Sequence, residues 1–66
     1  MLKEKIGIDA GTVFSALIDG SLELKDLRKV TKLTVKDLDQ ALGWLAREDK
    51  IYFSKGEGRD IYVTLS

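Results

Sequence analysis

The sequence predicts one α+β domain over residues 1–66, in which three short helices precede a C-terminal β-hairpin. In three stretches before residue 49, apolar residues recur every three or four positions, the spacing of amphipathic helices. After Lys50 the spacing changes to every second residue, which is typical of strands. A chain of 66 residues has no room for a second core, and its 44% hydrophobic content indicates a folded protein.

The first helix is predicted to begin at Asp9, a good N-cap residue, and to cover residues 10–18. Gly20 suits the left-handed conformation that ends many helices. The apolar stripe of this helix consists of Ala10, Val13, Phe14, Leu17 and Ile18. The apolar residues before the cap either add a helical turn or pack as an arm over the core: Leu2, Ile6 and Ile8.

Residues 21–23 alternate polar, apolar and polar, which is compatible with a very short strand. A second helix is predicted over residues 24–31, and its inward positions are Leu24, Leu27 and Val30. After a turn at residues 32–34, a third helix runs from Val35 to about Glu48. Thr34 and Asp37 have the spacing of a capping box in its weaker aspartate form. The inner stripe of the third helix is Val35, Leu38, Leu42 and Leu45, flanked by Ala41 and Ala46.

Two alternating runs, residues 51–55 and 61–65, surround a glycine-rich segment and predict a β-hairpin. With residues 56–58 as the loop, the facing pairs are Lys55–Arg59, Phe53–Ile61, Ile51–Val63 and Tyr52–Tyr62. One face then carries Ile51, Phe53, Ile61, Val63 and Leu65, and the other carries the two tyrosines. In this register Phe53 is buried, so Phe53→Ala is expected to cost roughly 3–5 kcal/mol.

Helix, short strand, helix, tight turn, helix and hairpin follow one another in the order of a winged helix-turn-helix domain. In that arrangement the apolar face of the hairpin packs on the helices, and its loop is the wing. The expectation rests on periodicity and on the lengths of the connecting segments.

The whole chain resembles a winged helix domain, and more narrowly a small prokaryotic family of stand-alone winged helix domains of unknown function, and two stretches carry this resemblance. The first stretch is residues 3–7, Lys-Glu-Lys-Ile-Gly. The second is residues 41–51, with a Leu-x-x-Leu-x-x-Glu-x-Lys-Ile pattern that contains a Gly-Trp pair. The resemblance implies the fold and a DNA-binding role, and it implies no established activity.

Composition argues against several classes of function. The chain contains no cysteine or histidine, which excludes disulfides, thiol chemistry, zinc fingers and imidazole catalysis. A metal site made of carboxylates alone is the one kind of metal site that the composition still allows. Asp37 and Asp39 point about 200° apart on a helix and cannot share a metal. The loop at residues 56–58 matches no phosphate-binding fingerprint. We therefore expect no enzyme activity, no cofactor, no metal and no small-molecule substrate.

The chain shows no sign of a membrane or an export segment. No apolar run approaches the ~20 residues of a membrane helix. Charged residues interrupt the first seven positions, unlike a signal peptide. Together with the lack of cysteine, these features predict a cytoplasmic protein.

Charge provides the evidence for and against nucleic acid as a partner. The 11 basic and 11 acidic residues cancel, unlike the balance of a strong non-specific DNA binder. The basic residues nevertheless cluster. Residues 24–33 contain four basic residues and one acidic residue, a net charge of +3. Residues 50–59 contain three basic residues and one acidic residue, a net charge of +2. The predicted phosphate contacts are Lys25, Arg28, Lys29, Lys55 and Arg59. The alternative is that these side chains only keep the surface soluble.

The third helix is the predicted recognition helix, because the second helix of a helix-turn-helix enters the major groove. Its outer face holds Lys36, Gln40, Gly43 and Arg47, of which the three polar residues are suited to bases or phosphates. Residues 34–48 nevertheless have two basic against three acidic residues, a net of −1: Asp37, Asp39 and Glu48 flank this face. The alternative is an ordinary solvated helix face.

Three aromatic residues are candidates for a protein interface: Trp44, Tyr52 and Tyr62. Trp and Tyr dominate binding hot spots, yet a half-buried Trp and an outward cross-strand tyrosine pair also have structural explanations. The sequence thus predicts a non-catalytic DNA-binding or transcription-regulatory module that binds double-stranded DNA. The alternative is a protein-interaction or homodimerisation module that keeps the same fold.

Overall fold

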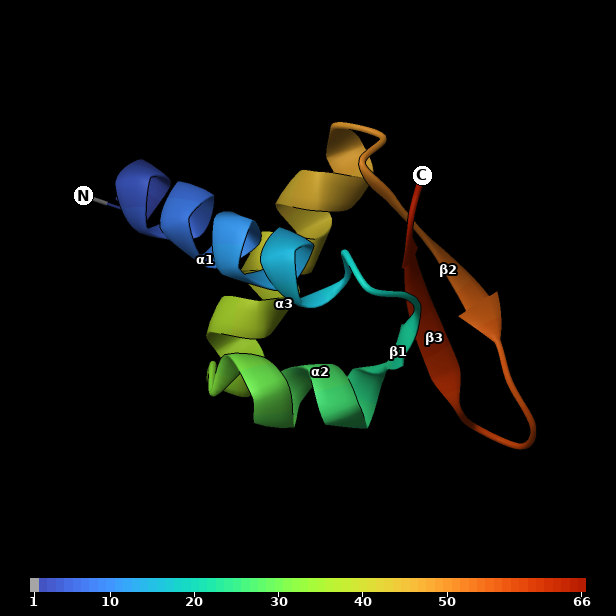
Figure 1. Ribbon diagram of the computed structural model, residues 1–66. Coiled ribbons are helices and arrows are strands. Elements are labelled where there is room, and N and C mark those ends of the chain that lie inside the picture. The colour runs from blue at the N-terminus through green and yellow to red at the C-terminus, as the bar shows by residue number, and fades with distance from the viewer. Residues whose placement is uncertain (1) are drawn as a thin grey trace.

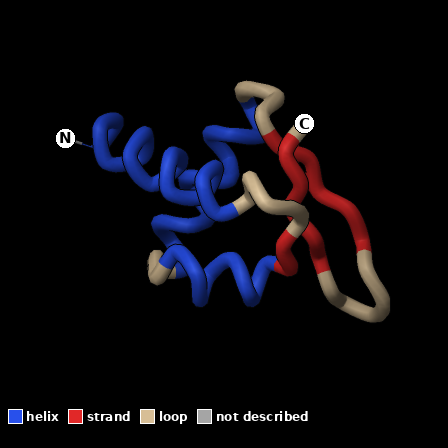
Figure 2. Tube along the Cα trace, in the orientation of Figure 1, coloured by secondary structure: helices blue, strands red, loops and turns tan. Residues whose placement is uncertain are grey.

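Three helices and a three-stranded antiparallel sheet make up the protein, in the order that the sequence predicts (Figure 1). The computed structural model describes residues 2–66. The elements are α1 (Leu2–Ala16), β1 (Leu22–Glu23), α2 (Leu24–Thr31), α3 (Val35–Arg47), β2 (Ile51–Lys55) and β3 (Ile61–Leu65). The helices lie on one side and the hairpin forms a wing on the other (Figure 2). The α+β winged helix architecture is therefore confirmed.

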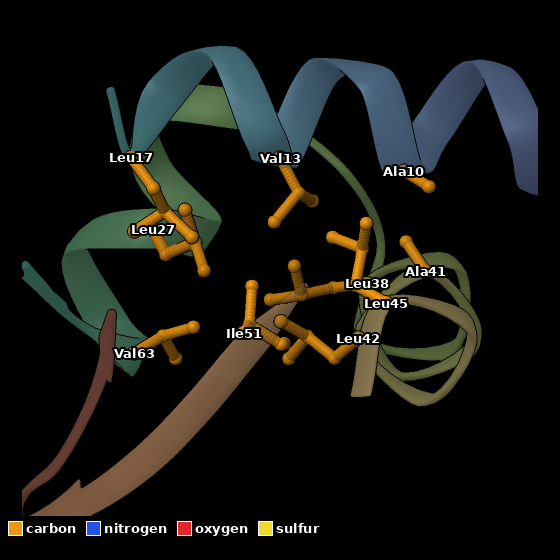
Figure 3. Close-up of a cluster of buried hydrophobic side chains, with 10 residues drawn as sticks. All are labelled: Ala10, Val13, Leu17, Leu27, Leu38, Ala41, Leu42, Leu45, Ile51 and Val63. Atoms are coloured by element: carbon orange, nitrogen blue, oxygen red, sulfur yellow. The ribbon is translucent and has the colours of Figure 1, made fainter. Parts of the chain in front are cut away.

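Among the side chains that the structure describes, ten buried apolar residues form the core, and they come from every element except β1 (Figure 3). Ala10 and Val13 of α1, and Leu17 directly after it, point toward α3 and the strands. Helix α3 supplies Leu38, Ala41, Leu42 and Leu45, and the remaining three are Leu27, Ile51 and Val63. Because α1 and α3 pack on each other more extensively than any other pair of elements, their contact is the centre of the fold.

The first helix begins earlier than predicted, because Asp9 is not its N-cap. Helix α1 starts at Leu2 and ends at Ala16, so the residues before Asp9 add helical turns instead of forming an arm. Asp9 lies in the middle of the helix and is 7% exposed, and its carboxylate accepts a hydrogen bond from Lys5 one turn earlier. Phe14 and Ile18 were expected in the core and are 39% and 62% exposed.

The helix-turn-helix unit has the predicted boundaries to within one residue. Lys32 ends α2 in the left-handed conformation (φ 59°), and its N–H donates to the carbonyl of Arg28. Thr34 is the N-cap of α3, since its hydroxyl oxygen accepts the N–H of Asp37 at 3.1 Å. Val30 and Val35 were predicted to point inward, and both predictions are wrong, since the two side chains are 60% and 51% exposed. They lie at the edges of the apolar stripes of α2 and α3, and only the middle of each stripe reaches the core.

The hairpin has a different register from the predicted one. Strand β3 lies between β1 and β2, and Ile51 pairs with Leu65, Phe53 with Val63 and Lys55 with Ile61. The loop spans residues 56–60 and is closed by a hydrogen bond from the Gly56 N–H to the Asp60 carbonyl. A shift of two residues leaves every side chain on its predicted face, so the alternating pattern fits both registers equally well.

This register changes the surroundings of the hairpin side chains. Phe53 and Ile61 do not face each other: Ile61 lies next to the loop and is 39% exposed, and Phe53 lies in the middle of β2 and is 48% exposed. Tyr52 pairs with Thr64, and Tyr62 pairs with Ser54, so the predicted Tyr52–Tyr62 pair is diagonal. The ring of Tyr62 packs where a Cβ at Gly56 would lie, so the loop needs glycine there.

Because Leu27 is fully buried, we expect Leu27→Ala to lower the free energy of unfolding by about 2–5 kcal/mol. Val30→Ala on the same helix is the matched control and should change it by about 0.5 kcal/mol or less. Phe53→Ala should cost only about 1–1.5 kcal/mol, because half of the ring is already in water. Equilibrium urea denaturation measures all three. A loss for Phe53→Ala equal to that for Leu27→Ala would contradict the observed register.

Candidate nucleic-acid interface

A groove of about 410 Å³ opens where α2, the N-terminal half of α3 and the wing meet. Its apolar lining is Leu24, Val35, Leu38 and Ile61. Its charged lining comprises three basic residues, Lys25, Arg28 and Arg59, and three acidic residues, Glu23, Asp39 and Asp60. The groove is therefore neither purely basic nor purely apolar.

The tertiary structure brings together two of the basic clusters that the sequence separates. Lys25 and Arg28 come from α2 and Arg59 comes from the wing loop, yet all three line the same groove. A second hollow of about 360 Å³ along α2 is lined by Lys25, Arg28, Lys29, Lys32 and Leu33. Lys55 is exposed at the end of β2 and lines neither hollow. Helix α2 thus presents a row of cations that continues toward the wing.

The predicted reading face of α3 lies beside this groove. Lys36, Gly43 and Arg47 are exposed, and Gln40 is half-buried. Their spacing of four, three and four residues places all of them on one side of α3, away from the buried stripe. The side chains that would meet base edges are therefore accessible.

Lys5 neutralises the charge of Asp37, one of the three acidic residues flanking the reading face of α3 that speak against DNA binding. Its ammonium group lies 3.1 Å from the carboxylate of Asp37 and 3.0 Å from that of Asp9. The hydrogen bond from Lys5 holds the pKa of Asp37 below its usual range, and the bonds to Asp9 and Asp37 raise the pKa of Lys5. Sequence reasoning missed Lys5, although its spacing of four residues from Asp9 was a signal.

The other two acidic residues have different positions. Asp39 lines the groove, where its charge opposes a phosphate. Glu48 lies beyond the other end of α3, beside α1. Of the acidic flank predicted from the sequence, only Asp39 therefore faces the basic residues of the groove.

Two carboxyl groups that sequence reasoning did not single out meet beside Arg59. Glu23 of β1 and Asp60 of the wing loop share a hydrogen bond, which raises the pKa of Glu23. Burial and the charge of Asp60 act in the same direction. The pairing arises because β1 lies against β3, and two strands this far apart in the chain carry no local signal for it.

The three candidate interface aromatics belong to two parts of the surface. Trp44 is 39% exposed and lines a hollow of about 520 Å³ between α1 and the C-terminal end of α3, together with Phe14. Tyr52 and Tyr62 lie on the hairpin and do not line this hollow. The packing of Tyr62 over Gly56 gives that ring a structural role of its own.

Neither a cluster of metal-binding side chains nor a membrane-spanning helix occurs in the part of the chain that the structure describes. Residues 2–66 contain no group of three or more acidic side chains that could hold a metal ion. Within the same residues, no helix has the length and apolar character to cross a membrane.

The fold agrees with comparisons to known proteins. Residues 1–65 match the family described as "Winged helix-turn-helix domain (DUF2582)". The chain belongs to this family. An uncharacterized protein of Methanocaldococcus jannaschii is 36% identical over 56 residues, which is 80% of each chain.

A solved structure extends the comparison to the backbone of this winged helix domain. The solution NMR structure of a protein from Bacteroides thetaiotaomicron matches with a TM-score of 0.83 and 32% identity, covering 98% of this chain and 79% of that one. The family description and these relatives point to a non-enzymatic winged helix fold, a class of domain for which DNA binding is the typical role.

We expect Glu23→Gln to raise the melting temperature at pH 7. The folded protein holds the Glu23 proton more tightly than the unfolded chain does. This contribution to stability is therefore complete below the usual glutamate pKa of 4.5 and is lost as the pH rises through the raised pKa. Glutamine keeps a neutral donor toward Asp60 at every pH.

Thermal unfolding monitored by circular dichroism at pH 7 and pH 4 measures this effect. The gain should shrink toward pH 4, where Glu23 itself holds its proton. Glu57→Gln is the control for removing one negative charge, because Glu57 is an exposed glutamate of the wing loop that carries Asp60. A melting temperature at pH 7 that falls on Glu23→Gln would show that the carboxyl pair has no such effect.

Proposed function

We propose that this winged helix domain is a non-catalytic DNA-binding module of the transcription-regulatory kind. One observation carries the proposal: Lys25 and Arg28 of α2 and Arg59 of the wing line one groove beside the start of α3. In a winged helix-turn-helix domain, the recognition helix enters the major groove while neighbouring elements contact the backbone. The position of Lys25, Arg28 and Arg59 around one groove beside α3 supports such a docking.

Each part of the surface has a separate role in this proposal. Lys36, Gln40 and Arg47 on α3 face the major groove, where a glutamine pairs with adenine and a basic side chain with guanine or phosphate. Lys25, Arg28, Lys29, Lys55 and Arg59 contact the phosphates on either side of α3. No cofactor, metal or small-molecule substrate takes part, and the domain performs no reaction.

Acidic residues in the same groove limit the affinity. Asp39 and the Glu23–Asp60 pair lie among the cations, so an approaching phosphate meets both signs of charge. The two signs also cancel over the whole chain. Binding should therefore be weak and strongly dependent on salt, and specificity has to come from the contacts of α3 with bases.

A protein-interaction module that does not read DNA is the second candidate function. The specific observation in its favour is the hollow at Trp44 and Phe14, which places two half-exposed aromatic rings on a surface that DNA docking does not use. The hollow lies between α1 and the C-terminal end of α3, apart from the groove that carries the DNA proposal.

We expect the wild-type protein to bind duplex DNA of random sequence with a steep salt dependence. If about four phosphates are contacted, the logarithm of the binding constant falls with the logarithm of the salt concentration at a slope of about −3.6. Fluorescence anisotropy with a labelled duplex at several low salt concentrations measures this slope. Absence of binding at the lowest salt would refute the DNA proposal and favour the interaction module.

Charge variants test where the DNA lies. Lys25→Glu combined with Arg59→Glu should abolish binding, and Asp39→Asn should strengthen it, because each changes the charge of the groove. Lys50→Glu is the matched control, since Lys50 lies near the other end of α3 and lines the hollow at Trp44. If the loss of binding free energy for Lys50→Glu were half of that for the double variant, in proportion to the charge reversed, net charge and not this groove would determine binding.

A further inference from the structure

Helix α1 has a second apolar face that no other element covers in the part of the chain that the structure describes. Its inner face points Ala10 and Val13 into the core, and Leu17 directly after the helix points the same way (Figure 3). On the outer side, Ile8 is 70% exposed and Phe14 is 39% exposed, and Ile18 just after the helix is 62% exposed. At 100° per residue, residues 8, 11, 14 and 15 fall within about 120° of the helix surface. A helix that is apolar on both sides normally has both sides buried.

The outer face of α1 continues onto α3 through the hollow at Trp44. Gly7, Gly11, Phe14 and Ser15 of α1 line this hollow together with Trp44. Trp44 is 39% exposed, so the indole extends the apolar surface beyond the helix. Figure 1 shows α1 along the outer side of the molecule, with its N-terminal half extending beyond the other elements. This surface is open to a partner.

The glycines of this face have no explanation within a single chain. Gly7 and Gly11 lie inside α1, where glycine disfavours the helix. A Cβ at either position would meet nothing within 4 Å, and neither residue has a positive φ. Alanine would therefore fit and would stabilise the monomer. A partner backbone that approaches closely is a physical reason for glycine at such positions.

We propose that this face binds a second copy of the same chain, with the two α1 helices antiparallel and crossing at Gly11. The face is nearly symmetric about Gly11. Three residues to either side lie Ile8 and Phe14, and four residues to either side lie Gly7 and Ser15. A two-fold axis at Gly11 therefore brings Ile8 of one copy against Phe14 of the other, and small residues against small residues.

Charge and area support a second copy as the partner. Between Ile6 and Ile18 the only charged residue is Asp9, which is buried and bound to Lys5, although 33% of the chain is charged. An uncharged face fits another uncharged face, and the centres of protein interfaces are depleted of charge. The face and Trp44 provide eight exposed residues: Gly7, Ile8, Gly11, Thr12, Phe14, Ser15, Ile18 and Trp44.

The size of this face is enough for a weak dimer. The chain exposes 4804 Å² over 66 residues, so eight residues of average exposure contribute about 580 Å² per copy. Stable interfaces begin at about 600 Å² per partner. The dimer should therefore form in the micromolar to sub-millimolar range. DNA plays no part in this assembly, so the inference is independent of the proposed function.

Sedimentation equilibrium of the full chain, from micromolar to sub-millimolar concentration, tests the proposal. The average mass should rise from 7.4 kDa toward twice that value. Ile8→Glu should raise the dissociation constant at least tenfold, since it places a charge against Phe14 of the other copy. Val30→Glu is the matched control, because Val30 is an equally exposed apolar residue on another helix, and it should leave the constant unchanged.

A glycine variant separates dimerisation from folding. Gly11→Ala should raise the melting temperature of the dilute monomer and also raise the dissociation constant several-fold. Gly43→Ala is the control, because Gly43 also lies inside a helix with no atom within 4 Å of a Cβ, and it should change only the melting temperature. A mass of 7.4 kDa at every concentration would overturn the proposal. A dimer that survives Ile8→Glu and dissociates on Tyr52→Glu would also overturn it, in favour of the hairpin.

Discussion

The packing of α1 across α3 is the contact on which the rest of the structure depends. Of the ten buried apolar residues among the described side chains, six belong to these two helices and Leu17 directly follows α1, and the strands add only Ile51 and Val63. Lys5 adds a polar constraint, since its ammonium group ties α1 to Asp37 in the first turn of α3. With one face of α3 held against α1 and the core, the opposite face is necessarily presented to solvent, and this face carries the predicted base-reading residues.

The same packing decides how the charges of a neutral chain act. Folding gathers Lys25, Arg28 and Arg59 around one groove, while Lys5 compensates Asp37 outside it. Acidic groups in the groove reduce its positive potential, so the surface suits a weak and selective contact better than strong non-specific binding. A small chain without disulfides also has little core to stabilise it, and a second copy on the outer face of α1 would bury further apolar surface.

Much of the fold could be predicted from local pattern. Helix α2, helix α3, the short strand β1 and the faces of the hairpin depend on periodicity, capping and turn residues, which are properties of neighbouring positions. The predicted start of α1 was wrong because Asp9 is a residue type typical of N-caps. Lys5, one turn earlier, provides the partner that lets the Asp9 carboxylate lie inside the helix. The predicted hairpin register was wrong because a shift of two residues preserves the alternation of apolar and polar side chains. Only the conformation of the loop distinguishes the two registers.

The candidate site depended on the tertiary structure to a greater degree. The sequence identified the basic residues of α2 and the wing and the exposed face of α3, because charge and helical spacing are local. It could not show that Arg59 joins α2 at one groove, that Glu23 meets Asp60, or that Phe14 lies beside Trp44. Periodicity also marks which side chains are apolar but not which of two apolar faces is buried. Residues far apart in the chain become neighbours only through the packing of α1 on α3 and of β1 on β3, and no local pattern encodes those contacts.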